Sequence, residues 1–209
     1  MAYASEEFEA LLSVVTHENG SDRKKKCNYY RQWLPTAFKI GTFTGLRLDE
    51  VVHLKFKDIF NDDGVWLLKV DNIKVNTLLG LKSDRRKRSV VIAVIDELWE
   101  VLTNECNFHK YQGTDRYILS PELGRKTVHS IVSKGFTHYK RVAKINGKKS
   151  FKELRTTFAT KLIAKYGEKY TSFVTDHTGK DVVDKHYTDK KVKAKTMKDF
   201  SVFGNSTSV

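Results

Sequence analysis

The stretch Thr44-Gly45-Leu46-Arg47-Leu48-Asp49-Glu50 joins two segments in which apolar residues recur at helical spacing. The first of these segments covers residues 28–43, and the second begins near Leu48 and continues through residues 51–54. Apolar residues at this spacing line one face of a helix and predict that the face is buried. Gly45 breaks the pattern, because glycine disfavours a helix interior. We therefore predict two consecutive helices, with Arg47 at the start of the second.

Arg47 carries a permanent charge on a planar guanidinium, whose N–H groups match the oxygens of a phosphate. Glu50 follows three positions later, one helical turn along, and is placed to orient that guanidinium. The ordinary alternatives are a solvated charge or a structural ion pair for Arg47, and a surface acid for Glu50. Taken alone, this stretch predicts a candidate anion site.

A second arginine, Arg155, ends the stretch Lys152-Glu153-Leu154-Arg155. Phe158, Leu162 and Ile163 follow it and predict an apolar helical face, which places Arg155 near the inner edge of a helix. A structural ion pair is again the ordinary alternative. Two guanidinium groups from separate helices are able to hold one phosphate from two sides.

The segment His186-Tyr187-Thr188 adds a phenol, which is a nucleophile that needs no metal. The chain has nine tyrosines, and most of them are expected to be packing or stacking residues. Tyr170 is the main rival of Tyr187, but it precedes the candidate histidine, His177. Two arginines and a tyrosine predict covalent chemistry on a nucleic-acid backbone.

These segments, in this order, resemble the catalytic domain of the tyrosine recombinases, also called phage-type integrases. The similarity runs from about Glu6 to about Thr188. It rests on the Thr-Gly-Leu-Arg-x-x-Glu box at residues 44–50, the His/Lys-x-x-Arg box at residues 152–155 and the Tyr-Thr pair at residues 187–188. It implies an α+β fold that is mainly helical, with a small antiparallel β-sheet. It also implies an enzyme that cuts one strand of double-stranded DNA through Tyr187, holds a 3′-phosphotyrosyl link, and lets a 5′ hydroxyl reverse the reaction.

The resemblance assigns a general acid to a lysine in the β-hairpin, and Lys82 matches best by its distance from the strand at residues 90–92. Because loop lengths vary there, Lys74, Lys87 and Arg88 stay open as alternatives. The other cations of residues 80–88 are expected to contact phosphates and to contribute affinity, not catalysis.

Lys152 stands where the family often has histidine, and as a cation it can donate to a phosphate oxygen. His177 is the candidate for the histidine before the nucleophile, although Asp176 precedes it where the family has glycine. The gap from His177 to Tyr187 is also one residue longer than usual. Lys180, after Gly179, is therefore a competing alignment. The resemblance implies neither a cofactor nor a metal, and it implies assembly into a tetramer on DNA.

The remaining pattern predicts a mainly helical domain with a few strands. A helix starts at Ser5 with acids in its first turn, and residues 16–26 form a polar loop. Pro35 either kinks or starts a helix. Strands are predicted at 65–70 and 89–94, and further helices at about 95–103, 127–145, 151–165 and 181–187.

Composition bounds the class of protein. The chain has 209 residues and a formal net charge of +13, which indicates a polyanionic partner. Cys27 and Cys106 have no disulfide-framework or zinc spacing and are expected to be reduced. Neither a membrane span nor a secretory signal is visible. We expect an intracellular protein, in a cytoplasm, a nucleoid or the host cell of a virus, with no membrane partner.

We expect residues 1–190 to form the catalytic domain and residues 191–209 a basic tail that packs in cis or in trans. The N-terminal DNA-clamp domain of the family has no counterpart before Ser5, which suggests a truncated form or a minimal enzyme. Two other activities share the chemistry, namely that of a type IB topoisomerase-like protein and that of a telomere-resolving enzyme. Lys152 and the irregular spacing of His177 also leave open a non-catalytic DNA-binding protein with a decayed site.

Overall fold

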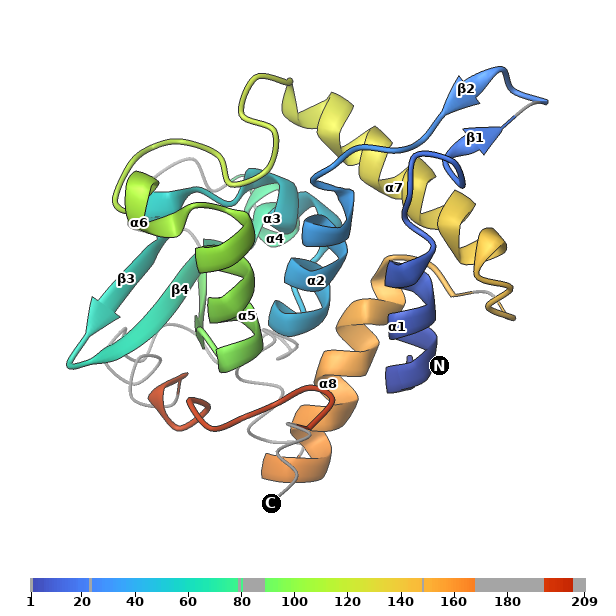
Figure 1. Ribbon diagram of the computed structural model, residues 1–209. Coiled ribbons are helices and arrows are strands. Elements are labelled where there is room, and N and C mark those ends of the chain that lie inside the picture. The colour runs from blue at the N-terminus through green and yellow to red at the C-terminus, as the bar shows by residue number, and fades with distance from the viewer. Residues whose placement is uncertain are drawn as a thin grey trace.

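Helix α2 (Leu34–Thr44) runs through the middle of the computed structural model, and nearly all of its side chains are buried. It packs against α3 (Leu48–His53), α5 (Asp96–Glu100), α7 (Arg125–Val142) and α8 (Lys152–Tyr166) (Figure 1). Pro35 occupies its first turn, where a missing N–H costs no helical hydrogen bond. The helix therefore starts at Leu34, which confirms the alternative that Pro35 starts a helix, and the apolar pattern at residues 28–33 lies before it.

The structure describes residues 2–22, 24–78, 80, 89–147, 149–167 and 194–204. The remaining helices are α1 (Ser5–Ser13), α4 (Ile73–Leu78), α6 (Phe108–Tyr111), the 3₁₀ helix η1 (Phe56–Asp58) and the π-helix η3 (Val101–Glu105). The strands are β1 (Ser21–Asp22), β2 (Cys27–Asn28), β3 (Ile59–Asp62), β4 (Val65–Asp71) and β5 (Ser89–Ala93). The predicted helix at 181–187 and most of the basic segment 80–88 lie outside the described residues.

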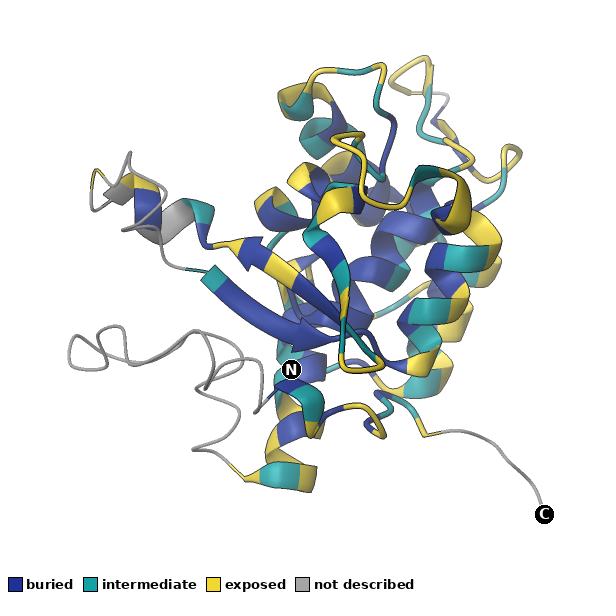
Figure 2. Cartoon of the chain, turned by 90° about the vertical axis from the view of Figure 1, so that its left-hand side faces the viewer, coloured by how far each residue is buried: buried dark blue, intermediate teal, exposed yellow. Residues whose placement is uncertain are grey.

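A three-stranded antiparallel sheet lies on one side of α2, in the order β3-β4-β5. Leu68 of β4 stands opposite Ile59 of β3 and Ile92 of β5, and all three are buried. Asp63 and Gly64 both have positive φ and form the two-residue turn between β3 and β4. An Asp-Gly pair in such a hairpin turn matches the twist of the flanking strands. Figure 2 shows the buried residues continuing from the sheet into the helices packed behind it.

The other predicted elements were found with small shifts. Helices α1, α7 and α8 confirm three predictions, as do strands β4 and β5. The predicted helix at 95–103 is a short α5 that continues as the π-helix η3. Strands β1 and β2 pair inside and just beyond the segment predicted as a loop, while β3, α4 and α6 were not predicted.

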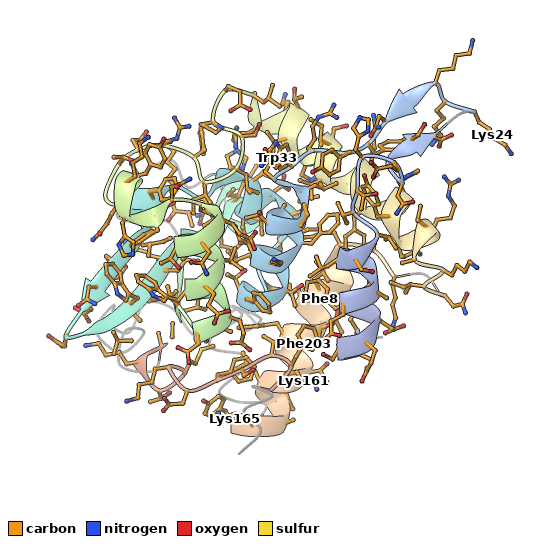
Figure 3. The ribbon with its side chains drawn as sticks, in the orientation of Figure 1. Phe8, Lys24, Trp33, Lys161, Lys165 and Phe203 are labelled. Atoms are coloured by element: carbon orange, nitrogen blue, oxygen red, sulfur yellow. The ribbon has the colours of Figure 1, made fainter. Side chains whose placement is uncertain are left out.

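The described part of the tail packs on the same chain. The ring centroids of Phe200 and Phe158 in α8 lie 5.6 Å apart, with the two rings perpendicular. Phe203 stacks on Phe8 in α1 with 5.4 Å between the ring centroids (Figure 3). The backbone N–H of Val202 donates to Glu97 of α5 over 3.0 Å. Residues 194–204 thus cover one end of α8. None of the helices among the described residues has the length and apolarity that crossing a membrane requires.

Candidate active site

Arg47 is held at the start of α3 by one carboxylate. The backbone N–H of Arg47 donates to Glu50 Oε2 over 2.8 Å, and its Nη1 donates to Glu50 Oε1 over 2.9 Å. The Glu50 side chain is only 2% exposed, whereas the Arg47 side chain is 30% exposed. The predicted orientation of Arg47 by Glu50 is confirmed, and the alternative of a surface acid was wrong. A buried anion fixes the guanidinium while part of it stays open to a ligand.

The residues before Arg47 shape a sharp turn. Gly45 ends α2 with a φ of 63°, and its N–H donates to the Gly41 carbonyl over 3.1 Å. Thr44 donates its hydroxyl to the Ile40 carbonyl and accepts from the N–H of Leu46. A left-handed residue at this position reverses the chain after a helix, which is why glycine is favoured there. The Thr-Gly-Leu part of the motif therefore sets the geometry that carries Arg47.

Arg155 reaches the same turn from α8. It is 9% exposed, and its Nη1 donates to the Gly45 carbonyl over 2.7 Å. Gly45 lies two residues before Arg47, so this bond joins the two arginine motifs at one turn. The predicted inner position of Arg155 is confirmed. Phe158 and Leu162 of its predicted apolar face are buried, but Ile163 is 45% exposed, so the face is narrower than predicted.

Gly45 also permits close packing between α2 and α8. A Cβ atom at this position would lie 2.4 Å from Cδ1 of Phe158, far inside van der Waals contact. Phe158 is 1% exposed, and its ring also contacts the ring of Phe200. The absence of a side chain at Gly45 is therefore what lets α8 approach closely enough for Arg155 to reach the carbonyl.

Lys152 is the first residue of α8, and it is exposed. It precedes Arg155 by three positions, so the two residues lie one helical turn apart on neighbouring positions of the helix surface. Three of the predicted site residues, Arg47, Lys152 and Arg155, are thus placed by α3 and by the first turn of α8. Lys82, His177 and Tyr187 lie outside the described residues, as do the alternatives Lys87, Arg88, Tyr170 and Lys180.

A partly buried cluster that the sequence did not reveal anchors the chain just before α8. Lys149 has a 7% exposed side chain, and its Nζ donates to Glu7 Oε1 over 2.7 Å and lies 4.7 Å above the ring of Tyr3. The hydrogen bond from Lys149 is the largest cause that lowers the pKa of Glu7. The backbone N–H of Tyr3 donates to Thr157 in α8 over 2.7 Å. In the sequence, Glu7 had the appearance of an ordinary acid in the first turn of a helix.

Asn72 is a second contact that the sequence did not reveal. It follows β4, it is 1% exposed, and its Oδ1 lies 3.5 Å from Arg47 Nη1. Asn72 begins the segment that leads to Lys82, and this contact places the beginning of that segment next to Arg47. No pattern in the sequence singled out this residue.

A groove of about 670 Å³ lies along α3, β4 and the loop that contains Tyr117, and Glu50 forms part of its wall. Its charges are balanced, because three lysines (Lys55, Lys57 and Lys69) face three acids (Glu50, Asp58 and Asp71). Among the residues that the structure describes, no group of three or more His, Cys, Asp or Glu side chains is placed to hold a metal ion.

Comparisons with known proteins bear on the family and the fold of the chain. Residues 5–193 match the Phage integrase family. No curated protein matches the chain in sequence. Among solved structures, the chain is similar to the XerH site-specific recombinase bound to difH, with a TM-score of 0.55 and 18% identity over 85% of this chain and 47% of that one.

Two structures of lambda integrase are also similar. The catalytic core aligns with a TM-score of 0.54 and 18% identity over 87% of this chain and 94% of that one. A lambda integrase tetramer bound to a Holliday junction aligns with a TM-score of 0.55 and 18% identity over 88% of this chain and 49% of that one. The chain therefore has the fold of the lambda integrase catalytic core, and it spans about half the length of the larger recombinases. The predicted fold class is confirmed.

Proposed function

Because the chain belongs to the phage integrase family, we propose that it is a site-specific recombinase that cuts and rejoins DNA through a 3′-phosphotyrosyl intermediate. The bond from Arg155 Nη1 to the Gly45 carbonyl is the observation that supports this best, since it brings a second guanidinium to the turn that carries Arg47. Two fixed cations beside one another match the two non-bridging oxygens of a scissile phosphate.

The proposed reaction begins when the phenol oxygen of Tyr187 attacks the phosphorus. A phosphotyrosyl bond forms, the bond from phosphorus to the 5′ oxygen breaks, and the phenolic proton leaves to solvent. Lys82 gives a proton to the departing 5′ oxygen. Arg47 and Arg155 stabilise the charge that develops on the non-bridging oxygens. The new ester conserves the bond energy, so a 5′ hydroxyl is able to reverse the step without ATP.

Lys152 and His177 are proposed as further donors to the phosphate. The exposed position of Lys152 on the first turn of α8 leaves its ammonium free to approach a ligand that Arg155 contacts. Double-stranded DNA is the proposed substrate, which the net charge of +13 favours. Assembly into a tetramer on DNA and an intracellular location are parts of the same proposal.

A nicked suicide duplex tests the proposal. When cleavage releases a short fragment that carries the 5′ hydroxyl and diffuses away, the phosphotyrosyl intermediate cannot be resealed and accumulates as an SDS-resistant adduct. Wild-type protein should give this adduct and Tyr187→Phe should not, while DNA binding stays within a few-fold. Tyr170→Phe is the matched control and should still form adduct. If Tyr187→Phe forms adduct, or Tyr170→Phe loses it, the assignment of the nucleophile is wrong.

The product on full substrates separates the activities that share this chemistry. Exchanged junctions between two duplexes support recombination. Relaxed circles without exchange indicate a type IB topoisomerase-like enzyme, and hairpin ends indicate a telomere-resolving enzyme. DNA binding with no adduct on any substrate would indicate a non-catalytic DNA-binding protein.

A further inference from the structure

The β1–β2 hairpin extends from the body of the protein beside α7, on the side away from the β3-β4-β5 sheet (Figure 1). A groove of about 680 Å³ lies between the hairpin segment and α7. Lys25 and Arg31 line it from the hairpin side, and Lys126 and Lys134 line it from α7. All four side chains are exposed. Lys126 and Lys134 are eight positions apart in α7, so they lie on one face of the helix.

A second hollow of about 530 Å³ shares Lys25, Tyr29 and Lys134 with the first, so the two are continuous. Further along α7 and just beyond it, this hollow is lined by Lys140, Arg141 and Lys144. Asp22, which lies 3.6 Å from Arg141, is the one acid among the described residues that line either hollow. We call the two hollows together the hairpin–α7 groove.

The charge of this groove contrasts with that of the groove along α3 and β4. There, three lysines face three acids, and Lys55 and Lys57 are moreover paired with Asp115. Hydrogen bonds from those two lysines lower the pKa of Asp115 to about 2. The hairpin–α7 groove has a large excess of cations instead, so its field attracts a polyanion.

The segments that flank the hairpin are fixed on α7 by partly buried contacts. The ring of Tyr29 lies 4.7 Å from the ring of His138, which is 6% exposed. His138 Nε2 lies 2.7 Å from the Asn19 carbonyl, and the Tyr139 hydroxyl donates to the Thr16 carbonyl over 2.9 Å. These contacts hold the cations of the hairpin at a set position across from those of α7. The lysines therefore form the two walls of a groove.

We propose that the hairpin–α7 groove binds the phosphate backbone of duplex DNA and contributes affinity outside the arginine site. The inference rests on the proposed function for the identity of the polyanion. α7 also connects the groove to the site, because Arg125 Nη1 donates to the Val52 carbonyl of α3 over 2.9 Å. One duplex lying across both elements would place the groove on DNA that flanks the scissile phosphate.

Cys27 provides a direct probe of the groove. It is exposed and lines the groove next to Lys25, whereas Cys106, the other cysteine of the chain, is buried. Burial also raises the pKa of the Cys106 thiol to about 12, so at neutral pH an uncharged maleimide should label Cys27 alone. Cys27→Ser is the matched control and should not be labelled in the native protein.

A duplex at a saturating concentration should slow the labelling of Cys27 by about tenfold or more. Poly-glutamate at the same concentration of charge should protect much less, because it lacks the spacing of a duplex backbone. If Cys27 is labelled at full rate while fluorescence anisotropy shows that DNA is bound, the groove does not hold DNA. Equal protection by poly-glutamate would also overturn the proposal, since it would indicate a general polyanion site.

A triple variant tests the energetics. Lys25→Gln, Lys126→Gln and Lys134→Gln together should make the dependence of log Kd on log salt shallower by about three units, at about 0.9 per lost phosphate contact. A triple Lys110→Gln, Lys161→Gln and Lys198→Gln variant removes the same charge from exposed positions elsewhere and should change the slope far less. Equal slopes for the two variants would mean that net charge alone, and not the groove, accounts for binding.

The two proposals fail in different ways. If wild-type protein forms no adduct but Cys27 is protected by duplex DNA, the recombinase proposal fails and the groove stands. If adduct forms while Cys27 is labelled freely in the bound complex, the groove fails alone.

Discussion

Replacing Gly45 by alanine tests how the two arginine motifs are brought together. The backbone at Gly45 has a φ of 63°, and holding an alanine there costs about 1–2 kcal/mol. The new Cβ would also lie 2.4 Å from Phe158 Cδ1, and overpacking of this kind costs about 1–3 kcal/mol. Gly45→Ala should therefore lower the free energy of unfolding by about 2–5 kcal/mol in urea titrations.

Gly64→Ala is the matched control, because Gly64 has a φ of 80° but no atom within 4 Å of the position that a Cβ would take. It should cost only the backbone part, about 1–2 kcal/mol. Phe158→Ala removes Cγ and Cδ1, the two atoms nearest to the new Cβ, so the double variant Gly45→Ala/Phe158→Ala should be more stable than the sum of the single losses predicts. If Gly45→Ala costs no more than Gly64→Ala, the close approach of α8 to the turn is wrong.

Arg155→Lys should cleave DNA at least about a hundredfold more slowly than wild type, because a point charge does not reproduce a planar fork of donors. A nearly normal rate would count against a clamp formed by Arg47 and Arg155. Lys82→Ala should be slow on ordinary DNA and close to wild type on DNA with a bridging sulfur at the scissile 5′ position, whose leaving group needs no proton; rescue of Lys87→Ala instead would move the general acid to Lys87. The pKa of Glu7 is lowered chiefly by Lys149, so this pair contributes stability above the ordinary carboxyl pKa and loses it as the pH falls through the lowered value. Lys149→Met should therefore destabilise the protein more at about pH 7 than at about pH 3 in urea titrations, and an equal loss at both would contradict the role of the pair.

Much of the fold was predictable from periodicity. α7 and α8 have long apolar patterns, and β4 and β5 are dense in β-branched and aliphatic residues, so local preference and burial agree. The hairpin of β1 and β2 was missed because its two-residue strands flank a run of lysines with no alternation of apolar and polar residues. Its position is set by contacts with α7 that are more than one hundred residues away, such as that of His138 with Asn19.

The residues of the arginine site were predictable from the sequence, but the contact that joins Arg155 to the turn at Gly45 was not. Glu50 follows Arg47 at helical spacing, so their ion pair could be predicted from position alone. The partner of Arg155 is the backbone carbonyl of Gly45, and no side-chain pattern reveals which carbonyl a guanidinium will find. Lys149 and Asn72 were missed for the same reason, since their partners depend on tertiary packing.

The central claim is that Arg47 and Arg155 act together on one scissile phosphate, and a methylphosphonate at that position tests it most directly. The methyl group replaces a charged non-bridging oxygen, so less negative charge is left for the arginines to stabilise. Arg47→Ala and Arg155→Ala should each slow single-turnover cleavage of ordinary DNA by about a hundredfold or more, and should slow cleavage of the methylphosphonate far less. If Arg155→Ala is equally slow on both substrates, its guanidinium serves only to join α8 to the Gly45 carbonyl, and the proposed clamp is wrong.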